Sequence, residues 1–194
     1  MLFPHPLLQK GAYPFRSKTS CERGIVMFKF NTKTIATLGV LLAMDIVLTR
    51  FLSFSAWNVR IGFGFVPVVI SAMLFGPVPA AVLAALGDFL GAVLFPIGPY
   101  FPGFTVTAAL TGLTFGFLLY RKNSAAKSLA AVVIVQFVLG LLLNTYWIHI
   151  LYHSPFVPLL ATRVMQSALL SVVQFVTIRM LYPLTGRLEG SVAA

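Results

Sequence analysis

Charged residues are scarce in this chain of 194 residues. Aspartate, glutamate, lysine and arginine together make up only 9% of it, and just four residues are acidic. Soluble domains carry about 25% of these residue types. Hydrophobic residues, by contrast, make up 59% of the sequence. The composition therefore excludes an ordinary soluble domain and indicates an integral membrane protein whose length fits one compact domain.

Cysteine and catalytic motifs are also nearly absent. Cys21 is the single cysteine, which excludes an internal disulfide, an iron–sulfur cluster and a cysteine-based zinc site. The sequence has neither a G-x-x-x-x-G-K-S/T phosphate loop nor an H-E-x-x-H pair. His149 and His153 are four residues apart, but no cysteine or acid accompanies them, so we predict no metal site. Without paired carboxylates or an activated nucleophile we predict no catalytic residue and no bound cofactor, and a small membrane enzyme or scaffold is a minor alternative.

Six apolar segments are long enough, or nearly so, to cross a bilayer, which takes about 20 residues. Short connections rich in proline and glycine separate them, such as FPIGPYFPG and YHSPFVP. We therefore predict an all-α integral membrane bundle of six transmembrane helices. The second helix is expected to be short and interrupted by Pro67. The predicted helices cover residues 33–52, 60–75, 78–95, 104–120, 126–151 and 158–186.

The net charge of +10 comes from 14 lysines and arginines against 4 acids. Because these basic residues lie mostly between apolar runs, they favour a role in membrane orientation, and we predict no nucleic-acid partner. In a six-helix chain, three groups of basic residues fall on one side: Lys29 and Lys33, then Arg121, Lys122 and Lys127, then Arg179 and Arg187. We therefore predict that this side and both termini are cytoplasmic.

The first 26 residues differ from the rest. They contain prolines at 4, 6 and 14, show no helical period and lack the apolar core of a signal peptide. The following segment, MFKFNTKTIATLGVLLA, starts at Met27 and has the pattern of a natural beginning. We predict that residues 1–26 are a disordered tail or an over-extended gene start, and that residues 27–194 form the six-helix membrane domain.

Three arginines lie near the outer ends of predicted helices, in apolar surroundings: Arg50, Arg60 and Arg163. A charge at membrane depth costs about 2.5–3.5 kcal/mol on insertion scales, so such a group normally faces the bundle interior or a wet cavity. Arginine binds carboxylate and phosphate groups through two hydrogen bonds, and outer acids are few, so the trio indicates a pocket for an anionic ligand. The alternatives are snorkelling to lipid headgroups, or pairing with Asp45 and Asp88.

Amide and aromatic side chains gather in the same outer half. Asn144 and Gln166 recur at helical spacing with other polar residues and can hydrogen-bond to the edge of a heterocycle. Aromatic residues such as Phe104 and Trp147 can stack on a planar ligand, and an interfacial aromatic belt is the alternative. The loop FPIGPYFPGFT contains three prolines and two glycines, which fits either a lid over a pocket or a plain turn.

Small residues follow three predicted helices at the intervals that permit close helix packing. We expect internal contacts along two of these stripes: Ala80, Ala84, Gly87 and Gly91 on one helix, and Gly112 and Gly116 on the next. The third stripe fits either an internal contact or a smooth surface for a partner protein: Ala36, Gly39 and Ala43.

These features occur together in a known family. Three stretches resemble the folate-specific substrate-binding subunits, or S components, of energy-coupling-factor (ECF) vitamin transporters: LTRFLSFSAWNVRIGFGFVPVVISAMLFGPVPA, GDFLGAVLFPIGPYFPGFTVTAALTGLTFGFLLYRKN and LLNTYWIHILYHSPFVPLLATRVMQSALL. The resemblance covers about residues 29–187 and has no counterpart for residues 1–26. The GDFLGA, FP and FPGFT elements, in that order, are its specific part.

The resemblance implies a multi-pass protein of the bacterial cell membrane in which residues 27–194 form a substrate-binding domain. Such a subunit captures folate outside the cell and delivers it inward with a transmembrane coupling subunit and two ATPase subunits, which use the ATP. The resemblance also implies that the whole subunit topples in the membrane during delivery. An S component for another vitamin, such as thiamine or riboflavin, is the alternative.

The family carries an A-x-x-x-A patch on its first helix that docks on the coupling subunit. Here the matching stretch is GVLLA, with Gly39 in place of the first alanine. The predicted partner-docking residues are Ala36, Gly39 and Ala43. The predicted substrate-binding residues are Arg50, Arg60, Phe104, Thr105, Asn144, Trp147, Arg163 and Gln166.

Overall fold

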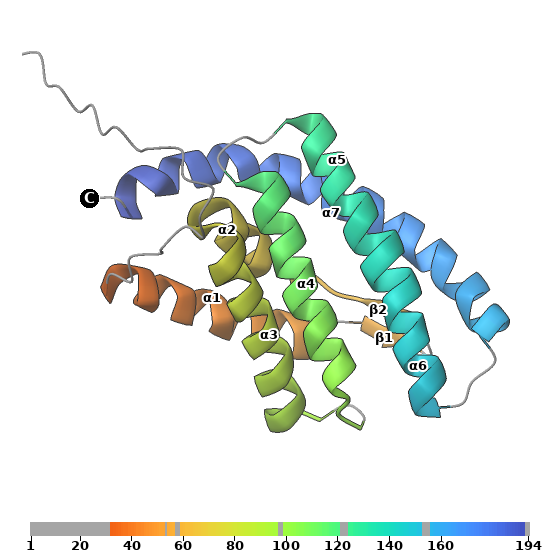
Figure 1. Cartoon of the computed structure of the whole chain (residues 1–194). Coiled ribbons are helices and arrows are strands. Elements are labelled where there is room, and N and C mark those ends of the chain that lie inside the picture. The colour runs from red at the N-terminus through yellow and green to blue at the C-terminus, as the bar shows by residue number, and fades with distance from the viewer. Residues whose placement is uncertain are drawn as a thin grey trace, which may run out of the picture.

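The computed structural model describes residues 32–52, 54–56, 59–96, 99–120, 124–152 and 156–192. The predicted division at residue 26 lies outside them. The described elements are α1 (Thr32–Arg50), β1 (Phe54–Ala56), β2 (Val59–Ile61), α2 (Phe65–Phe75), α3 (Pro77–Leu94), α4 (Pro102–Leu119), α5 (Ala125–Val133), η1 (Ile134–Leu143), α6 (Asn144–Tyr152) and α7 (Phe156–Val192). Since α5, η1 and α6 are continuous, the described chain forms six helical rods. In Figure 1, α3, α4 and the α5–α6 rod run side by side, and α1 and α7 cross them at an angle.

Prolines mark the beginnings of three helices. Pro77 and Pro102 are the first residues of α3 and α4, where a missing N–H costs nothing because the first turn has no acceptor for it. Pro67 lies in the first turn of α2 for the same reason, so the expected interruption of this helix is wrong. Gly76 separates α2 from α3 with a φ of 91°, a left-handed conformation that glycine adopts without a steric penalty.

The second predicted helix begins later than expected. Residues 59–61 form strand β2, which pairs antiparallel with β1 and places Arg60 opposite Ser55. The helix itself starts only at Phe65, after Gly62 and Gly64. With 11 residues it is about 16 Å long, roughly half the hydrocarbon thickness of a bilayer. The small hairpin was not predicted at all.

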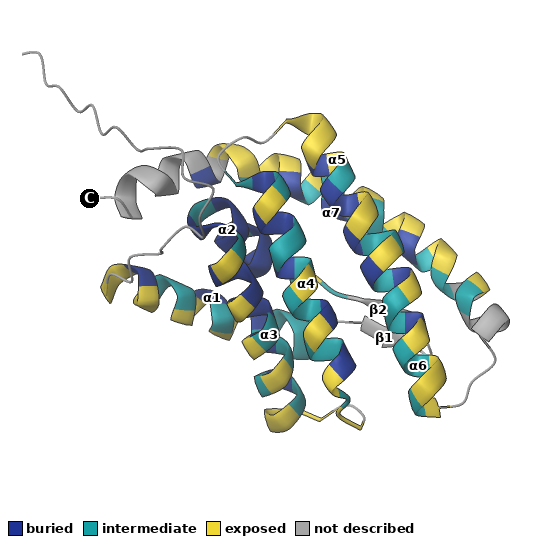
Figure 2. Cartoon of the chain, in the orientation of Figure 1, coloured by how far each residue is buried: buried dark blue, intermediate teal, exposed yellow. Residues whose placement is uncertain are grey.

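The outer surface is apolar, as a lipid environment requires. In the described part of the chain, five helical stretches are long and apolar enough to cross a membrane: 32–50, 77–94, 102–119, 125–152 and 163–183. Helix α1 is inverted relative to a soluble helix, because it buries Asp45 while Val40 and Val47 are exposed. Figure 2 shows exposed residues along the outer sides of the rods and buried residues concentrated where α2, α3 and α4 meet. The structure is therefore that of a membrane bundle.

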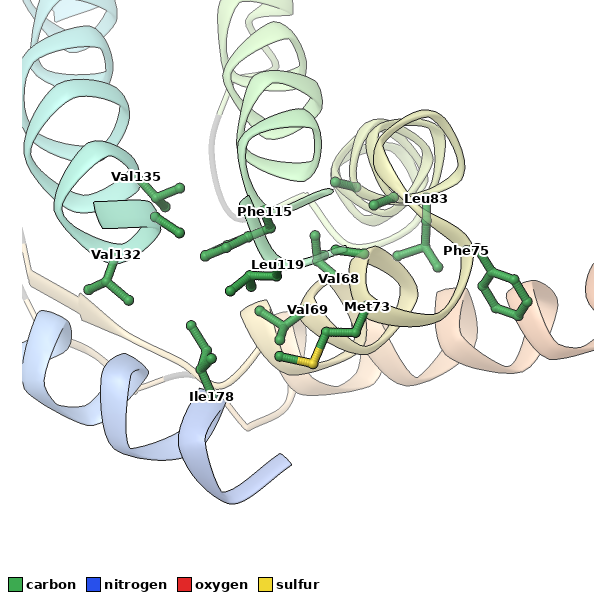
Figure 3. Packing of buried hydrophobic residues seen from close by; sticks show 14 of the residues in the cluster. Val68, Val69, Met73, Phe75, Leu83, Phe115, Leu119, Val132, Val135 and Ile178 are labelled. Atoms are coloured by element: carbon green, nitrogen blue, oxygen red, sulfur yellow. The ribbon is translucent and has the colours of Figure 1, made fainter. Parts of the chain in front are cut away.

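The hydrophobic core occupies one half of the bundle. Figure 3 shows the side chains of Phe115 and Leu119 from α4 meeting Val132 from α5, Val69 from α2 and Ile178 from α7. All five are buried almost completely. The core therefore lies around the C-terminal half of α4, and the N-terminal half of that helix lies outside the core.

The predicted internal contacts of the two small-residue stripes are confirmed, and the glycines of α4 bring it against α3. A Cβ atom on Gly112 would overlap the backbone of Ala80, and one on Gly116 would overlap Pro77. Glycine at both positions lets the two helices approach until their backbones touch. This seam fixes α3 and α4 as a pair, and the functional site opens at the other end of that pair.

Candidate functional site

A cavity of about 930 Å³ lies in the half of the bundle opposite the core. Each of the six described rods contributes to its wall, and so does the segment from Pro99 to Phe101 before α4. Pockets that bury small molecules measure about 300–1,000 Å³, so the volume suits one vitamin-sized ligand. The N-terminal half of α4 forms one wall, from Phe104 to Thr111, and α7 contributes the wall from Arg163 to Gln174.

Two of the three predicted arginines line this cavity. Arg50 ends α1 and lies against Gly91 of α3, where an added Cβ would be 2.7 Å from its Nε atom. Arg163 reaches the cavity from α7. The Nε atoms of both are buried and have no hydrogen-bond partner among the described residues. Arg60 lies in β2, beside α7, and its side chain is outside the described part of the structure.

Both predicted amides line the cavity as well. Asn144 begins α6 and Gln166 lies on α7, one turn from Arg163. The Oδ1 atom of Asn144 is buried and lacks a partner within the described residues. A buried polar atom normally has a hydrogen-bond partner, so this oxygen and the two arginine nitrogens mark positions where a ligand would supply one.

A second amide pair lies deeper. Gln136 donates from Nε2 to the Oε1 atom of Gln174 over 3.0 Å, which joins the α5–α6 rod to α7 across the cavity wall. Gln136 belongs to η1, a π-helical segment of 10 residues in the middle of the rod. Such wide turns are rare and are frequently found at functional sites. The π segment also presents Gly140 to the cavity, which leaves space beside Gln136.

Aromatic residues form the wall at the start of α4. Phe101 and Phe104 line the cavity and meet edge to face, with ring centroids 6.1 Å apart. Trp147 packs against Phe101 at 5.5 Å and donates its indole N–H to Thr107 over 3.1 Å. Trp147 and Thr105 are not among the residues that form the cavity wall, so they lie behind it. Their predicted contact with a ligand stays a prediction, and the structure gives both of them a supporting position.

Two acids line the cavity, Asp45 and Asp88, and neither was predicted as a site residue. Asp45 is buried between α1 and the glycines at 64 and 87, where a Cβ on Gly87 would overlap its carboxylate. Asp88 accepts a hydrogen bond of 2.8 Å from Thr105. Both acids lie on the α1–α3 side, whereas Arg163 reaches the cavity from α7. The sequence offered a signal in both cases, because an acid inside an apolar helix must face a polar interior.

The predicted docking stripe lies on the outside. Ala36, Gly39 and Ala43 are all exposed on α1. A Cβ on Gly39 would meet no atom within 4 Å. The internal-contact interpretation of this stripe is therefore wrong within the described chain, and the surface is free for another molecule.

Comparisons with known proteins agree with this architecture. The profile of the family described as "ECF-type riboflavin transporter, S component" matches residues 29–187. A relative from Clostridium novyi (strain NT), "Folate transporter FolT", is 37% identical over 153 residues, which cover 78% of this chain and 89% of the relative. A relative of the same name from Leuconostoc mesenteroides subsp. mesenteroides is 30% identical over 128 residues, or 65% of this chain and 69% of the relative.

Two solved structures share the fold. "Crystal structure of FolT bound with folic acid" superposes with a TM-score of 0.74 at 30% identity and covers 78% of this chain and 93% of that one. "Structure and mechanism of the S component of a bacterial ECF transporter" superposes with a TM-score of 0.57 at 21% identity, over 79% and 97% of the two chains, and supports the fold alone. With an apolar bundle, a cavity among its helices and matches over most of its length, this chain belongs to the membrane-embedded S components of ECF-type transporters, which are transport proteins rather than enzymes.

Proposed function

We propose that this chain is a high-affinity folate-binding S component that captures folate outside the cell and delivers it to the cytoplasm. One observation carries the proposal: a cavity of about 930 Å³ holds Arg50, Arg163 and Asn144 with buried atoms that lack a partner among the described residues. Folate offers what these groups require. Its glutamate has two carboxylates for guanidinium groups, and its pterin ring has donors and acceptors for amides.

The relatives support the same ligand. Two proteins that are 37% and 30% identical to this chain are named folate transporters. The solved structure with a TM-score of 0.74 holds folic acid. The flat rings of folate also suit the aromatic wall of Phe101 and Phe104, which line the cavity.

Riboflavin is the second candidate, because the family profile that matches residues 29–187 is named for it. Riboflavin carries no carboxylate, so it would leave the guanidinium group of Arg163 without an anionic partner, whereas Arg50 lies on the same side of the cavity as Asp45 and Asp88. A buried cation without such a partner is costly. The cavity therefore favours folate over riboflavin and over thiamine, which is itself a cation.

A vitamin panel tests the proposal. The chain is purified in detergent without ATP, and its melting temperature is measured with folic acid, riboflavin or thiamine present. A ligand that binds the folded state raises the melting temperature by mass action, so we expect a rise with folic acid alone. Isothermal titration then gives the dissociation constant. A rise with riboflavin and none with folic acid would replace folate by riboflavin and keep the transporter class.

The orientation in the membrane forms part of the proposal. We infer that both termini are cytoplasmic and that the cavity opens to the outside. The short α2 completes one of six crossings together with residues 59–64. The basic residues expected on the cytoplasmic side support this orientation. Protease treatment of intact spheroplasts should spare a C-terminal tag, and cleavage of the tag would reverse the assignment.

Delivery would require partner subunits. We propose that a transmembrane coupling subunit docks on Ala36, Gly39 and Ala43, and that two ATPase subunits hydrolyse the ATP. The exposure of this stripe supports the first part, because small residues on a helix surface let another helix approach closely. The absence of a phosphate loop from the sequence supports the second.

A further inference from the structure

Two threonines in the first turns of α4, Thr105 and Thr107, form hydrogen bonds to different neighbouring helices, α3 and α6. Thr105 donates to the carboxylate of Asp88 on α3 over 2.8 Å. Its oxygen is also 3.1 Å from the hydroxyl of Tyr100. A hydroxyl has one proton, so Thr105 donates it to Asp88 and Tyr100 must be the donor in the second bond. Thr105 therefore ties the start of α4 to α3 and to the segment before α4.

Thr107 makes the corresponding ties on the other side. It donates to the carbonyl of Gly103 over 2.9 Å and accepts from the indole N–H of Trp147 over 3.1 Å. Trp147 belongs to α6, so this bond ties the same turn of α4 to the α5–α6 rod. A Cβ on Gly103 would approach Phe101 and Trp147 within 2.6 Å, so there is little free space in this turn.

The two ties lie on either side of Phe104 in the cavity wall, and Thr107 itself lines the cavity. Successive residues of an α-helix are about 100° apart around its axis. Phe104, Ala108 and Thr111 therefore point in nearly the same direction, and all three line the cavity. Thr105 lies about 100° to one side of Phe104, and Thr107 lies about 60° to the other. A bond on each side opposes rotation of α4 about its own axis.

We propose that Thr105, held by Asp88, is a positioning residue that fixes the rotation of α4 and thereby aims Phe101 and Phe104 at the bound vitamin. The inference rests on the proposed function, because it requires a ligand in the cavity. Thr105 acts through the two phenylalanines and not by contact with the ligand. The carboxylate of Asp88 serves as an acceptor for Thr105, so its charge is not required.

Equilibrium binding of folic acid to purified variants tests this. Thr105→Val removes the hydroxyl at nearly constant volume, and Asp88→Ala removes the acceptor. We expect each to weaken binding roughly tenfold, and the double variant to be no weaker than either single one, because both remove one interaction. Thr105→Ser and Asp88→Asn keep the donor and the acceptor, so they should remain within about twofold of the wild type.

Thr114→Val is the matched control. Thr114 is on the same helix and, among the described residues, its hydroxyl bonds only the carbonyl of Leu110, so the same substitution there should leave affinity unchanged. A spectroscopic measurement separates aiming from general stability. Trp57 and Trp147 are the two tryptophans, so Trp57→Phe leaves Trp147 as the reporter. Because Trp147 contacts Phe101 and Thr107, we expect Thr105→Val to shift its emission in the folded, ligand-free protein.

Several results would overturn the inference. Binding by Thr105→Val that equals binding by Thr114→Val would overturn it. Asp88→Asn that binds as poorly as Asp88→Ala would also overturn it, because the charge of Asp88 would then act directly. If Thr105→Val does not fold, Thr105→Ala replaces it as the variant that lacks the hydroxyl. If neither of these variants folds while Thr105→Ser does, the hydroxyl is needed for folding and not for the orientation of Phe101 and Phe104. Wild-type protein that binds riboflavin and not folic acid refutes the proposed function alone, and the same variants are then titrated with riboflavin.

Discussion

Arg163 is the residue whose replacement should affect ligand binding most directly. Its guanidinium lies in the cavity wall with a buried Nε atom that lacks a partner among the described residues. If it holds a carboxylate of folate, Arg163→Ala should weaken binding by about 1.5–3 kcal/mol, or roughly 10- to 150-fold, as measured by titration calorimetry. Arg163→Lys keeps the charge but loses the paired N–H donors of the guanidinium group, so its affinity for folic acid should lie between those of the wild type and Arg163→Ala.

Arg179 on the same helix provides the control for this measurement. It is exposed and does not line the cavity, so Arg179→Ala should bind folic acid normally. Unchanged affinity after Arg163→Ala would assign Arg163 to the arginines that snorkel to lipid headgroups.

Gly91 tests the position of Arg50. A Cβ at Gly91 would lie 2.7 Å from Nε and 3.0 Å from Nη2 of Arg50. The arginine is flexible enough to move aside, so Gly91→Ala should weaken folic acid binding about tenfold with little change in melting temperature. Gly39→Ala, where the added Cβ meets nothing within 4 Å, should leave binding unchanged and add about 0.5–1 kcal/mol of stability. Normal binding of folic acid by Gly91→Ala would show that binding does not depend on the present position of Arg50.

Residue type predicted much of the cavity wall but not the support behind it. Arg50, Arg163, Asn144 and Gln166 could be found because polar groups in an apolar helix must face a polar interior. Thr105 could not be placed, because threonine is common on both sides of a membrane helix and its role depends on the rotation of α4. That rotation is set by contacts with α3 and α6, which no local pattern encodes.

At the scale of the elements, the ends of most long helices were predictable and the irregular segments were not. Helix α7 is the exception, because it runs to Val192 and the predicted helix ended at residue 186. Prolines and apolar runs placed α3 and α4 within two residues of their observed bounds. The hairpin of β1 and β2 was missed because each strand has only three residues, too few to show alternation. The π segment was missed because its sequence, IVQFVLGLLL, has the composition of an ordinary membrane helix.

The seam between α3 and α4 should govern stability separately from binding. A Cβ on Gly116 would overlap Pro77, whose ring and backbone cannot move aside. We expect Gly116→Ala to lower the free energy of unfolding by about 1–3 kcal/mol, seen as a lower melting temperature in detergent. The folded fraction should bind folic acid normally, because Gly116 lies in the half of α4 away from the cavity.

Phe117 on the same helix is the control for the seam. Its side chain is 72% exposed, so Phe117→Ala leaves the seam intact and should cost less than about 1 kcal/mol. Equal losses from Gly116→Ala and Phe117→Ala would contradict the importance of the close contact.

At the scale of the whole molecule, α1 separates binding from transport. It carries Arg50 at its cavity end and the exposed stripe of Ala36, Gly39 and Ala43 on its outer surface. Gly39→Leu should therefore bind folic acid normally and lose most folate uptake in cells that contain the partner subunits, because the larger side chain roughens the docking surface. Val172→Leu, at another exposed position on α7, is the control and should support normal uptake. Uptake at the wild-type level by Gly39→Leu would place the docking surface elsewhere.

The division of the bundle into a packed half and a hollow half has a mechanical consequence. Side chains from every described rod surround the hollow, whereas most of the buried hydrophobic contacts between rods lie in the packed half. A vitamin inside it would add contacts among rods that are joined at this end by a few hydrogen bonds, such as Thr105 to Asp88 and Gln136 to Gln174, and would stiffen the open half as a missing piece of core. Amide exchange at the cavity ends of α4 and α7 should therefore slow on loading, so that the partner subunits receive a more rigid body.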